Sequence, residues 1–139
     1  MFRVPAGVES GTLGASGQLV ILDMKGSLWL AGDYGRSAWR RLGSFPVPPS
    51  HNGSARAAHL GDRIVTVATD RRTTPPTQDL QICDASGSVG PPRPLSDILG
   101  QAGAHHVGGG VFRAERPNGN TGIWTLRPTA PHTPPHFME

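Results

Sequence analysis

Arginine is the side chain through which this sequence could most readily bind a charged ligand. The chain has 13 Lys and Arg residues against 10 Asp and Glu residues, and Lys25 is its single lysine. A planar guanidinium group donates paired hydrogen bonds to carboxylates and phosphates, so the adjacent Arg71 and Arg72 could clamp an anionic group. The same two arginines could equally be solvated charges on a Thr- and Pro-rich loop. The arginines form neither a run nor a helical stripe, so nucleic acid is not an expected partner.

Tryptophan offers a second route to binding, because its ring can stack on the face of a sugar. Trp29 and Trp124 stand within runs of Leu and Ile, a pattern that is typical of a protein core. Trp39 is followed by Arg40 and Arg41, which favours an exposed position. We therefore expect Trp39 and Arg40 to belong to a ligand-binding surface.

The histidines do not form a pattern that is typical of a metal site. His105 and His106 are adjacent in an expected strand and should point to opposite faces, which argues against one ion between them. His132 and His136 lie in a proline-broken tail, where helical spacing is not available. We expect no metal and no cofactor.

No motif of a known catalytic chemistry is found in the sequence. Phosphate-binding loops, zinc-protease helices and serine-hydrolase elbows are absent, and Gly108-Gly109-Gly110 precedes a strand rather than a helix. Tyr34, the single tyrosine, lies in an expected tight turn. Cys83 is the single cysteine, which excludes an internal disulfide and favours a small buried residue. We expect a protein that is not an enzyme.

The elements that must position these residues are predicted to be β-strands in three repeats. Gly (19 residues) and Pro (14 residues) punctuate short apolar runs, which indicates a turn-rich β protein. Apolar runs around Val20, Val65 and Val111 recur at intervals of 45 and 46 residues. The run Leu19 to Leu22 is apolar on both faces, so we expect it to lie between neighbouring layers. Residues 1–128 should form one domain, with repeats at about 11–43, 56–95 and 103–128, followed by an extended Pro/His tail at 129–139.

Each repeat is expected to be a four-stranded antiparallel meander. The three central strands are 19–22, 64–67 and 111–114, the strands before them are 12–15, 57–60 and 104–107, and the strands after them are 27–31, 80–83 and 122–126. Fourth strands are expected at 38–42 and 88–90, and none in the third repeat. We expect Phe2 to Pro5 to complete that repeat, within the chain or in trans.

The segment 17–43 resembles one blade of a β-propeller. It reads as an apolar strand, a D-x-x-G turn at Asp23 to Gly26, an L-W strand at Leu28-Trp29 and a final W-x-x-L-G strand at 39–43. This order is similar to tectonin-like and sialidase-type repeats, although Ala31 stands where an Asp-box has Ser. The resemblance implies a propeller-like, all-β fold. Three blades are fewer than the usual four to eight or so, so we expect a half ring completed by a second chain. A small β-sandwich or barrel is the alternative.

Long loops on one side of such a repeat are the expected interaction surface, because a rigid scaffold holds them in place. With Trp39 and Arg40, the candidate ligand-binding residues are Arg71, Arg72, His51, Asn52, Arg116 and Asn118.

The expected function is non-enzymatic recognition of a glycan or protein by a homo-oligomer, most simply a dimer. The alternative is a structural accessory subunit of a phage, virion or other large assembly. The first ten residues lack an apolar leader, and no stretch approaches a membrane span of about 18 residues. We therefore expect a cytoplasmic or virion-associated protein without membrane contact.

Overall fold

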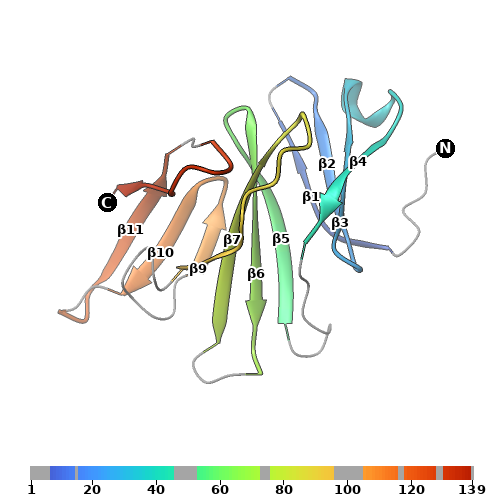
Figure 1. Ribbon diagram of the computed structural model, residues 1–139. Helices are drawn as coiled ribbons and strands as arrows, with labels where there is room; N and C mark the ends of the chain where they lie inside the picture. Colours follow the sequence, from blue (N-terminus) through green and yellow to red (C-terminus); the bar gives the residue numbers. More distant parts are fainter. Residues whose placement is uncertain are drawn as a thin grey trace.

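The chain folds into three antiparallel β-sheets (Figure 1). The computed structural model describes residues 7–14, 16–45, 53–72, 76–95, 105–115, 118–127 and 130–138. Within these residues the fold is all-β, and the three sheets have four strands each and do not close into a barrel. The all-β class and the repeated meander are therefore confirmed.

Strands that follow one another in the chain pair with one another in every sheet. The first sheet has β1 (Val8–Leu13), β2 (Leu19–Asp23), β3 (Ser27–Ala31) and β4 (Arg40–Ser44). The second sheet has β5 (Gly53–Leu60), β6 (Arg63–Asp70), β7 (Thr77–Asp84) and β8 (Arg93–Pro94). The third sheet has β9 (His105–Gly108), β10 (Val111–Glu115), β11 (Thr121–Leu126) and β12 (Phe137–Met138). A short 3-10 turn, η1 (Asp33–Gly35), joins β3 to β4.

The predicted equivalence of the three central runs holds at the level of the strand. Val20, Val65 and Val111 lie in β2, β6 and β10, each of which is the second strand of its sheet. Their cross-strand partners also correspond, because Val20 faces Leu30, Val65 faces Ile82 and Val111 faces Thr125 on the third strand. The spacing of 45 and 46 residues therefore reflects a repeated structural unit.

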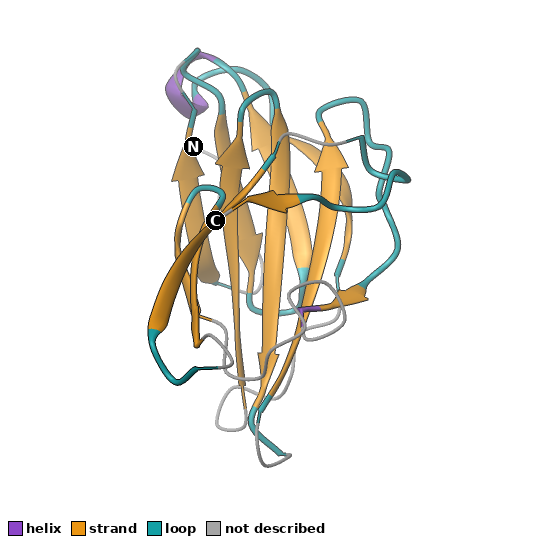
Figure 2. Cartoon of the chain, turned by 90° about the vertical axis from the view of Figure 1, so that its left-hand side faces the viewer, coloured by secondary structure: helices purple, strands orange, loops and turns teal. Residues whose placement is uncertain are grey.

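The sheets pack face to face, with the second sheet between the other two (Figure 1). Their longer strands run in similar directions (Figure 2). One core lies between the first and second sheets and contains Val20, Leu22, Ile64 and Cys83 among others. The other core lies between the second and third sheets and is built around Phe112, together with Val65, Val67, Leu80, Ile82 and Leu126. β6 contributes to both cores, since successive strand residues point to opposite faces.

The expectation that β2 is buried on both faces is wrong. Val20 and Leu22 are fully buried against the second sheet, whereas Leu19 and Ile21 are only partly buried. The reason is the position of the sheet in the stack. Among the described residues no further sheet covers the outer face of the first one. Strands enclosed on both sides therefore belong to the second sheet, where β5, β6 and β7 each contribute buried residues to both cores.

The expectation that the third repeat has no fourth strand is also wrong. The C-terminal tail returns, and β12 pairs with β11 through Thr125–Met138 and Leu126–Phe137. The Phe137 ring lies edge-on to Phe112 with centroids 5.1 Å apart. This contact adds aromatic packing to two residues of strand pairing. Phe2 to Pro5 lies outside the described residues, and the place that it was expected to fill beside β11 is taken by β12.

The fourth strands of the first two sheets differ from their predicted positions. β4 spans Arg40–Ser44 instead of 38–42. In the second sheet the expected strand at 88–90 is reduced to one bridge between Cys83 and Val89, and β8 follows after Pro91 and Pro92. Proline has no N–H to donate to a ladder, which explains the interruption.

The D-x-x-G turn between β2 and β3 is organised by the buried carboxylate of Asp23. Its Oδ1 accepts hydrogen bonds from the backbone N–H groups of Lys25 and Ser27, both at 2.9 Å, and its Oδ2 accepts one from Trp29 Nε1 at 3.1 Å. Burial by itself raises the pKa of Asp23, but these hydrogen bonds outweigh burial and leave the pKa below its usual value. The carboxylate therefore stays ionised and holds the turn at neutral pH.

Replacing Asp23 with Asn should destabilise the fold by about 1–3 kcal/mol at pH 7, because the amide N–H2 would face one of three donors. A depressed folded-state pKa stabilises the protein above the unfolded pKa, and this stabilisation is lost as the pH falls through the folded pKa. The variant should therefore also show a flatter stability profile below about pH 4. Urea unfolding across this pH range measures both effects. Asp62→Asn, in an exposed turn, is the matched control and should change the free energy of unfolding by under about 0.5 kcal/mol.

Cys83 should be nearly inert in the folded protein. Its side chain is fully buried, and burial, with a smaller effect of Asp84, raises the pKa of the thiol to about 12. The thiolate is the reactive form, so labelling by a thiol reagent at pH 8 should be at least about a thousandfold slower than in urea. Rapid labelling of the native protein would contradict the assigned core position.

Candidate functional site

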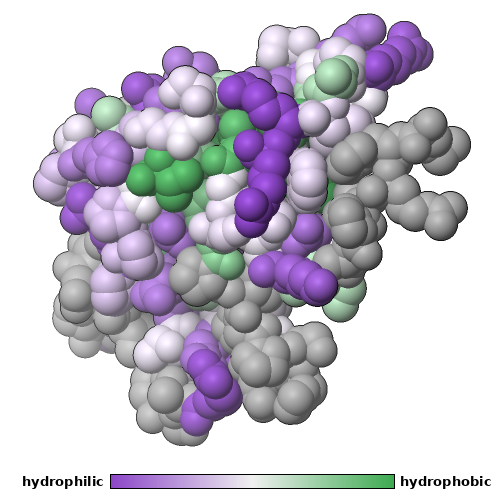
Figure 3. Space-filling view, turned by 45° about the vertical axis from the view of Figure 1, so that its right-hand side comes forward, coloured by the Kyte–Doolittle hydropathy of each residue, from purple (hydrophilic) through white to green (hydrophobic). Residues whose placement is uncertain are grey.

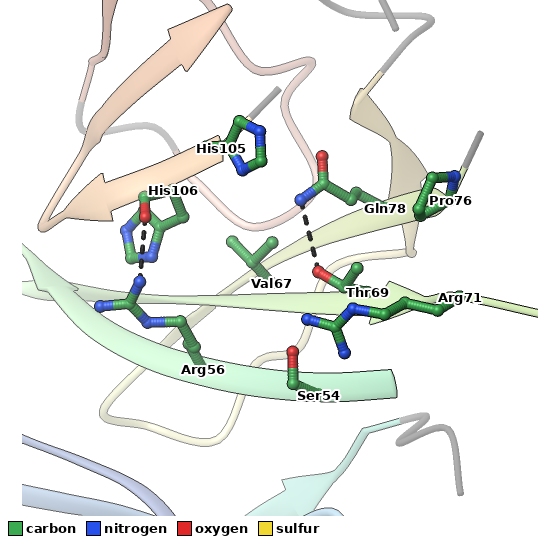
Figure 4. Close-up of a pocket in the computed structure, with 9 residues that line it drawn as sticks. All are labelled: Ser54, Arg56, Val67, Thr69, Arg71, Pro76, Gln78, His105 and His106. Atoms are coloured by element: carbon green, nitrogen blue, oxygen red, sulfur yellow. Dashed lines mark hydrogen bonds between the residues drawn. The ribbon is translucent and has the colours of Figure 1, made fainter. Parts of the chain in front are cut away.

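A cavity of about 290 Å³ lies between the second and third sheets (Figure 4). Its residues come from the N-terminal part of β5, the C-terminal half of β6, the start of β7 and the start of β9, together with the β6–β7 loop. This is the end of the second sheet where its long loop lies. The lining residues are Ser54, Arg56, Val67, Thr69, Arg71, Pro76, Gln78, His105 and His106.

Two arginines give the cavity its charge. Arg56 extends from β5 and donates a hydrogen bond to the backbone carbonyl of His106, at 2.9 Å, which links β5 to β9 (Figure 4). Arg71 enters from the β6–β7 loop. None of the nine described lining residues is an Asp or Glu, so no carboxylate from the described part of the chain lines the cavity beside the two guanidinium groups.

Three of the other lining residues carry neutral polar groups. Ser54, Thr69 and Gln78 supply hydroxyl and amide groups, and Gln78 Nε2 donates to Thr69 Oγ1 at 3.3 Å. Val67 and Pro76 provide apolar surface. A mainly apolar lining with a few polar groups is typical of a site that orients a small ligand.

The two histidines border the cavity from β9. The His106 ring packs against Phe112, with centroids 4.9 Å apart, and its Nε2 hydrogen-bonds the carbonyl of Gly109 at 2.8 Å. Burial lowers the pKa of His106, partly opposed by the Gly109 bond and reinforced by Arg56. His106 is therefore neutral at pH 7. Its Nδ1 is buried and has no hydrogen-bond partner within the described parts of the chain.

The adjacent Arg71 and Arg72 do not form the clamp that their sequence suggests. Arg72 pairs with Asp70 through Nε and Nη2, at 2.9 and 2.7 Å, and does not line the cavity. The hydrogen bonds from Arg72 lower the pKa of Asp70 to about 2. The pair in the cavity is instead Arg71 with Arg56. Sequence reasoning missed Arg56 because it reads as an ordinary exposed position in an alternating strand.

Trp39 and Arg40 lie away from this cavity. Trp39 lines a shallow groove with Leu19, Tyr34 and Arg36, beside the β3–β4 loop. Arg40 donates a hydrogen bond to the carbonyl of Ala85, which ties β4 to the β7–β8 turn.

The β3–β4 loop that carries this groove has an unusual backbone. Asp33 and Tyr34 both have positive φ, at 49° and 55°, which non-glycine residues rarely adopt. The Tyr34 N–H donates to the Gly17 carbonyl at 2.7 Å. Tyr34 is well exposed at 62%.

The other predicted site residues are not brought together. Asn118 caps its own hairpin turn, since its Oδ1 accepts a hydrogen bond from the Asn120 N–H at 3.0 Å, and it does not line the cavity. His51, Asn52 and Arg116 lie outside the described residues. Trp29 is half-buried on the outer face of the first sheet, whereas Trp124 packs against the core around Phe112.

Within the described ranges, no group of three or more His, Cys, Asp or Glu residues is arranged to hold a metal ion. None of the helical segments in the same ranges has the length and apolar character needed to span a membrane. Comparisons with protein-family models, curated proteins and solved structures find no match to this chain.

The assignment of Arg72 to Asp70 can be tested by titration. In the wild type the Asp70 carboxyl should titrate near pH 2, because Arg72 stabilises its ionised form. In Arg72→Ala its pKa should return towards the usual value of about 3.9. Side-chain carboxyl NMR shifts measure both values. An unchanged Asp70 pKa in the variant would show that Arg72 is not its partner.

Proposed function

We propose that this protein is a non-enzymatic binding module that recognises an acidic glycan in the cavity between the second and third sheets. The observation that carries the proposal is the pair of guanidinium groups, Arg56 and Arg71, in one cavity where none of the nine described lining residues is an Asp or Glu. The ligand supplies the missing negative group as a carboxylate, sulfate or phosphate on a sugar.

Electrostatics favour an anion at this place. Two like charges near each other are destabilising in a partly enclosed site, and an anion between them removes that repulsion. Hydrogen bonds from guanidinium groups to an anion are shorter and stronger than neutral ones. Arg56 is already oriented by its bond to the His106 carbonyl, so little side-chain freedom is lost on binding.

The size and remaining chemistry of the cavity suit one sugar ring. A volume of about 290 Å³ is near the lower limit for small-molecule sites, which begins at about 300 Å³. Ser54 and Thr69 can hydrogen-bond ring hydroxyl groups, while Val67 offers an apolar contact to a ring face. The cavity has both cationic groups and an apolar surface. A sugar acid can contact both of them, whereas a free inorganic anion can contact only the cationic groups.

The propeller-like arrangement belongs to the same proposal. Three face-packed meanders support it, and so do contacts between the first strands of neighbouring sheets. The Ala57 N–H on β5 donates to Ser10 Oγ of β1 at 3.1 Å, and Arg56 of β5 reaches β9. Side-by-side first strands are the arrangement expected if the sheets radiate from a common axis.

The proposal is tested with a glycan array followed by calorimetry. Sugars bearing carboxylate, sulfate or phosphate groups should bind, and their neutral counterparts should bind at least about tenfold more weakly. Arg56→Ala and Arg71→Ala should each weaken binding about 10- to 100-fold, which corresponds to a loss of about 1.4–2.8 kcal/mol. The salt dependence should fall in both variants.

Arg72→Ala is the matched control, because it removes the neighbouring arginine but not a cavity residue. It should leave affinity unchanged within about twofold. Trp39→Ala reports on the groove beside Tyr34. Loss of glycan binding in Trp39→Ala, with Arg56→Ala unaffected, would refute the cavity assignment and favour the groove.

The structural alternative predicts a different result. A subunit that only builds a larger assembly should bind none of the three acidic sugar classes and should co-purify in a large particle. Binding of RNA or DNA with the same dependence on Arg56 and Arg71 would also contradict glycan recognition.

A further inference from the structure

The stack of three sheets ends with two unlike faces. Val20 of β2 points towards the second sheet and Val65 of β6 points towards the third, and both are fully buried there. Val111 is the corresponding residue of β10. It points away from the Phe112 face and is only partly buried, because the described chain has no fourth sheet to cover it.

The opposite end of the stack shows the complementary face. Ile64 and Cys83 of the second sheet face the first sheet, and Phe112 of the third faces the second. The corresponding residues of the first sheet are Leu19 and Ile21, which lie on its outer face and are partly exposed.

Exposed apolar side chains are confined to these two end sheets and their turns. Among the described residues the large exposed hydrophobic side chains are Val8, Leu13, Met24, Tyr34, Val107, Ile123 and Met138. None belongs to the second sheet, which is covered on both faces. In Figure 3 apolar side chains, in green, come to the surface between strongly polar ones.

We propose that two copies of this chain associate head to tail, with the outer face of the third sheet of each copy packed on the outer face of the first sheet of the other. Each of the two contacts between sheets in the chain joins unlike faces. One sheet contributes the face that carries Val20 or Val65, and the next sheet contributes the face that carries Ile64 or Phe112. The face with Val111 on the third sheet and the face with Leu19 and Ile21 on the first sheet remain without such a partner among the described residues. A second copy is therefore the occupant that continues the packing already present between sheets.

Two such contacts close the assembly. A head-to-tail contact forms a ring if the rotation closes and an open filament if it does not. With three sheets in each copy, two copies give a ring of six sheets in which every sheet is covered on both faces. The cavity lined by Arg56 lies within one copy, so this association does not depend on the proposed ligand.

The test combines one charged substitution at each end with a mixing experiment. Leu13→Asp changes the outer face of the first sheet, and Ile123→Lys changes the outer face of the third. Both side chains are about half exposed in the single chain, at 55% and 51%, so the variants should fold. Far-UV circular dichroism and the protection of Cys83 from labelling confirm folding.

Sedimentation velocity at 5–50 μM or so should show wild type at twice the mass of one chain. Each variant alone should be monomeric, with the dissociation constant raised at least about 100-fold. An equimolar mixture of the two variants should dimerise again, because each pair then has one unchanged contact and one Asp–Lys contact. Asp62→Lys, in the exposed β5–β6 turn, is the control and should remain dimeric.

Several outcomes would overturn the proposal. A monomeric wild type at about 50 μM would refute self-association. Loss of the dimer in only one variant would indicate a symmetric contact between like faces. Failure of the mixture to dimerise would exclude head-to-tail pairing, and a ladder of larger species would exclude closure by two copies. Loss of acidic-glycan binding with the dimer intact would affect only the proposed function.

Discussion

The burial of β6 on both faces is the constraint from which the rest of the structure follows. Ile64 and Val65 are adjacent, point in opposite directions and are both fully inaccessible to water. A strand of this kind needs an apolar layer on each side, and an antiparallel meander can cover only its own edges. The chain therefore has to supply a sheet before β6 and a sheet after it. Leu22 from the first sheet and Phe112 from the third, which meet the second sheet from its two sides, are among the largest fully buried side chains.

The same strand explains why the cavity lies where it does. Along β6 the side chains change from fully buried at Val65 to partly exposed at Thr69 and Asp70. The apolar packing between the second and third sheets ends at Val67, and polar side chains of β5 and β7 take its place. The cavity therefore begins where the buried apolar residues of β6 end. The packed core next to it holds the strands that carry the cavity residues.

The strands could be predicted from the sequence because their signal is local. Runs of Val, Ile and Leu bounded by glycine turns identify β2, β6 and β10 and their hairpin partners. β12 could not be predicted, since two residues after a series of prolines have no periodicity. Its pairing with β11 and the contact of Phe137 with Phe112 depend on the tertiary structure. Burial on both faces was predicted for β2, whereas the structure shows it for β6. The sequence pattern of a strand does not show whether its sheet lies in the middle or at the end of the stack.

The site was predictable only in part for a related reason. Arg71 was identified as a site residue from its place in a long loop. Arg72 was identified with it, but Arg72 pairs with Asp70 at the end of β6, and the sequence does not show which of the two arginines makes this pair. Arg56 became a site residue through the approach of β9, which is about 50 residues away in the chain. Contacts between sheets are not encoded in the alternation of one strand.

The late position of β12 in the chain has a consequence for how the protein is made. The first and second sheets take all their strands from continuous stretches that end at Ser44 and Pro94, and each can assemble as synthesis proceeds. The third sheet has the longest connection before its fourth strand, with ten residues between β11 and β12 against eight at the same place in each of the other two sheets. Until residue 138 has been added, the free edge of β11 offers unpaired N–H and C=O groups to any neighbouring nascent chain. Crowded ribosomes on one messenger are therefore the setting in which this fold is most exposed to mispairing.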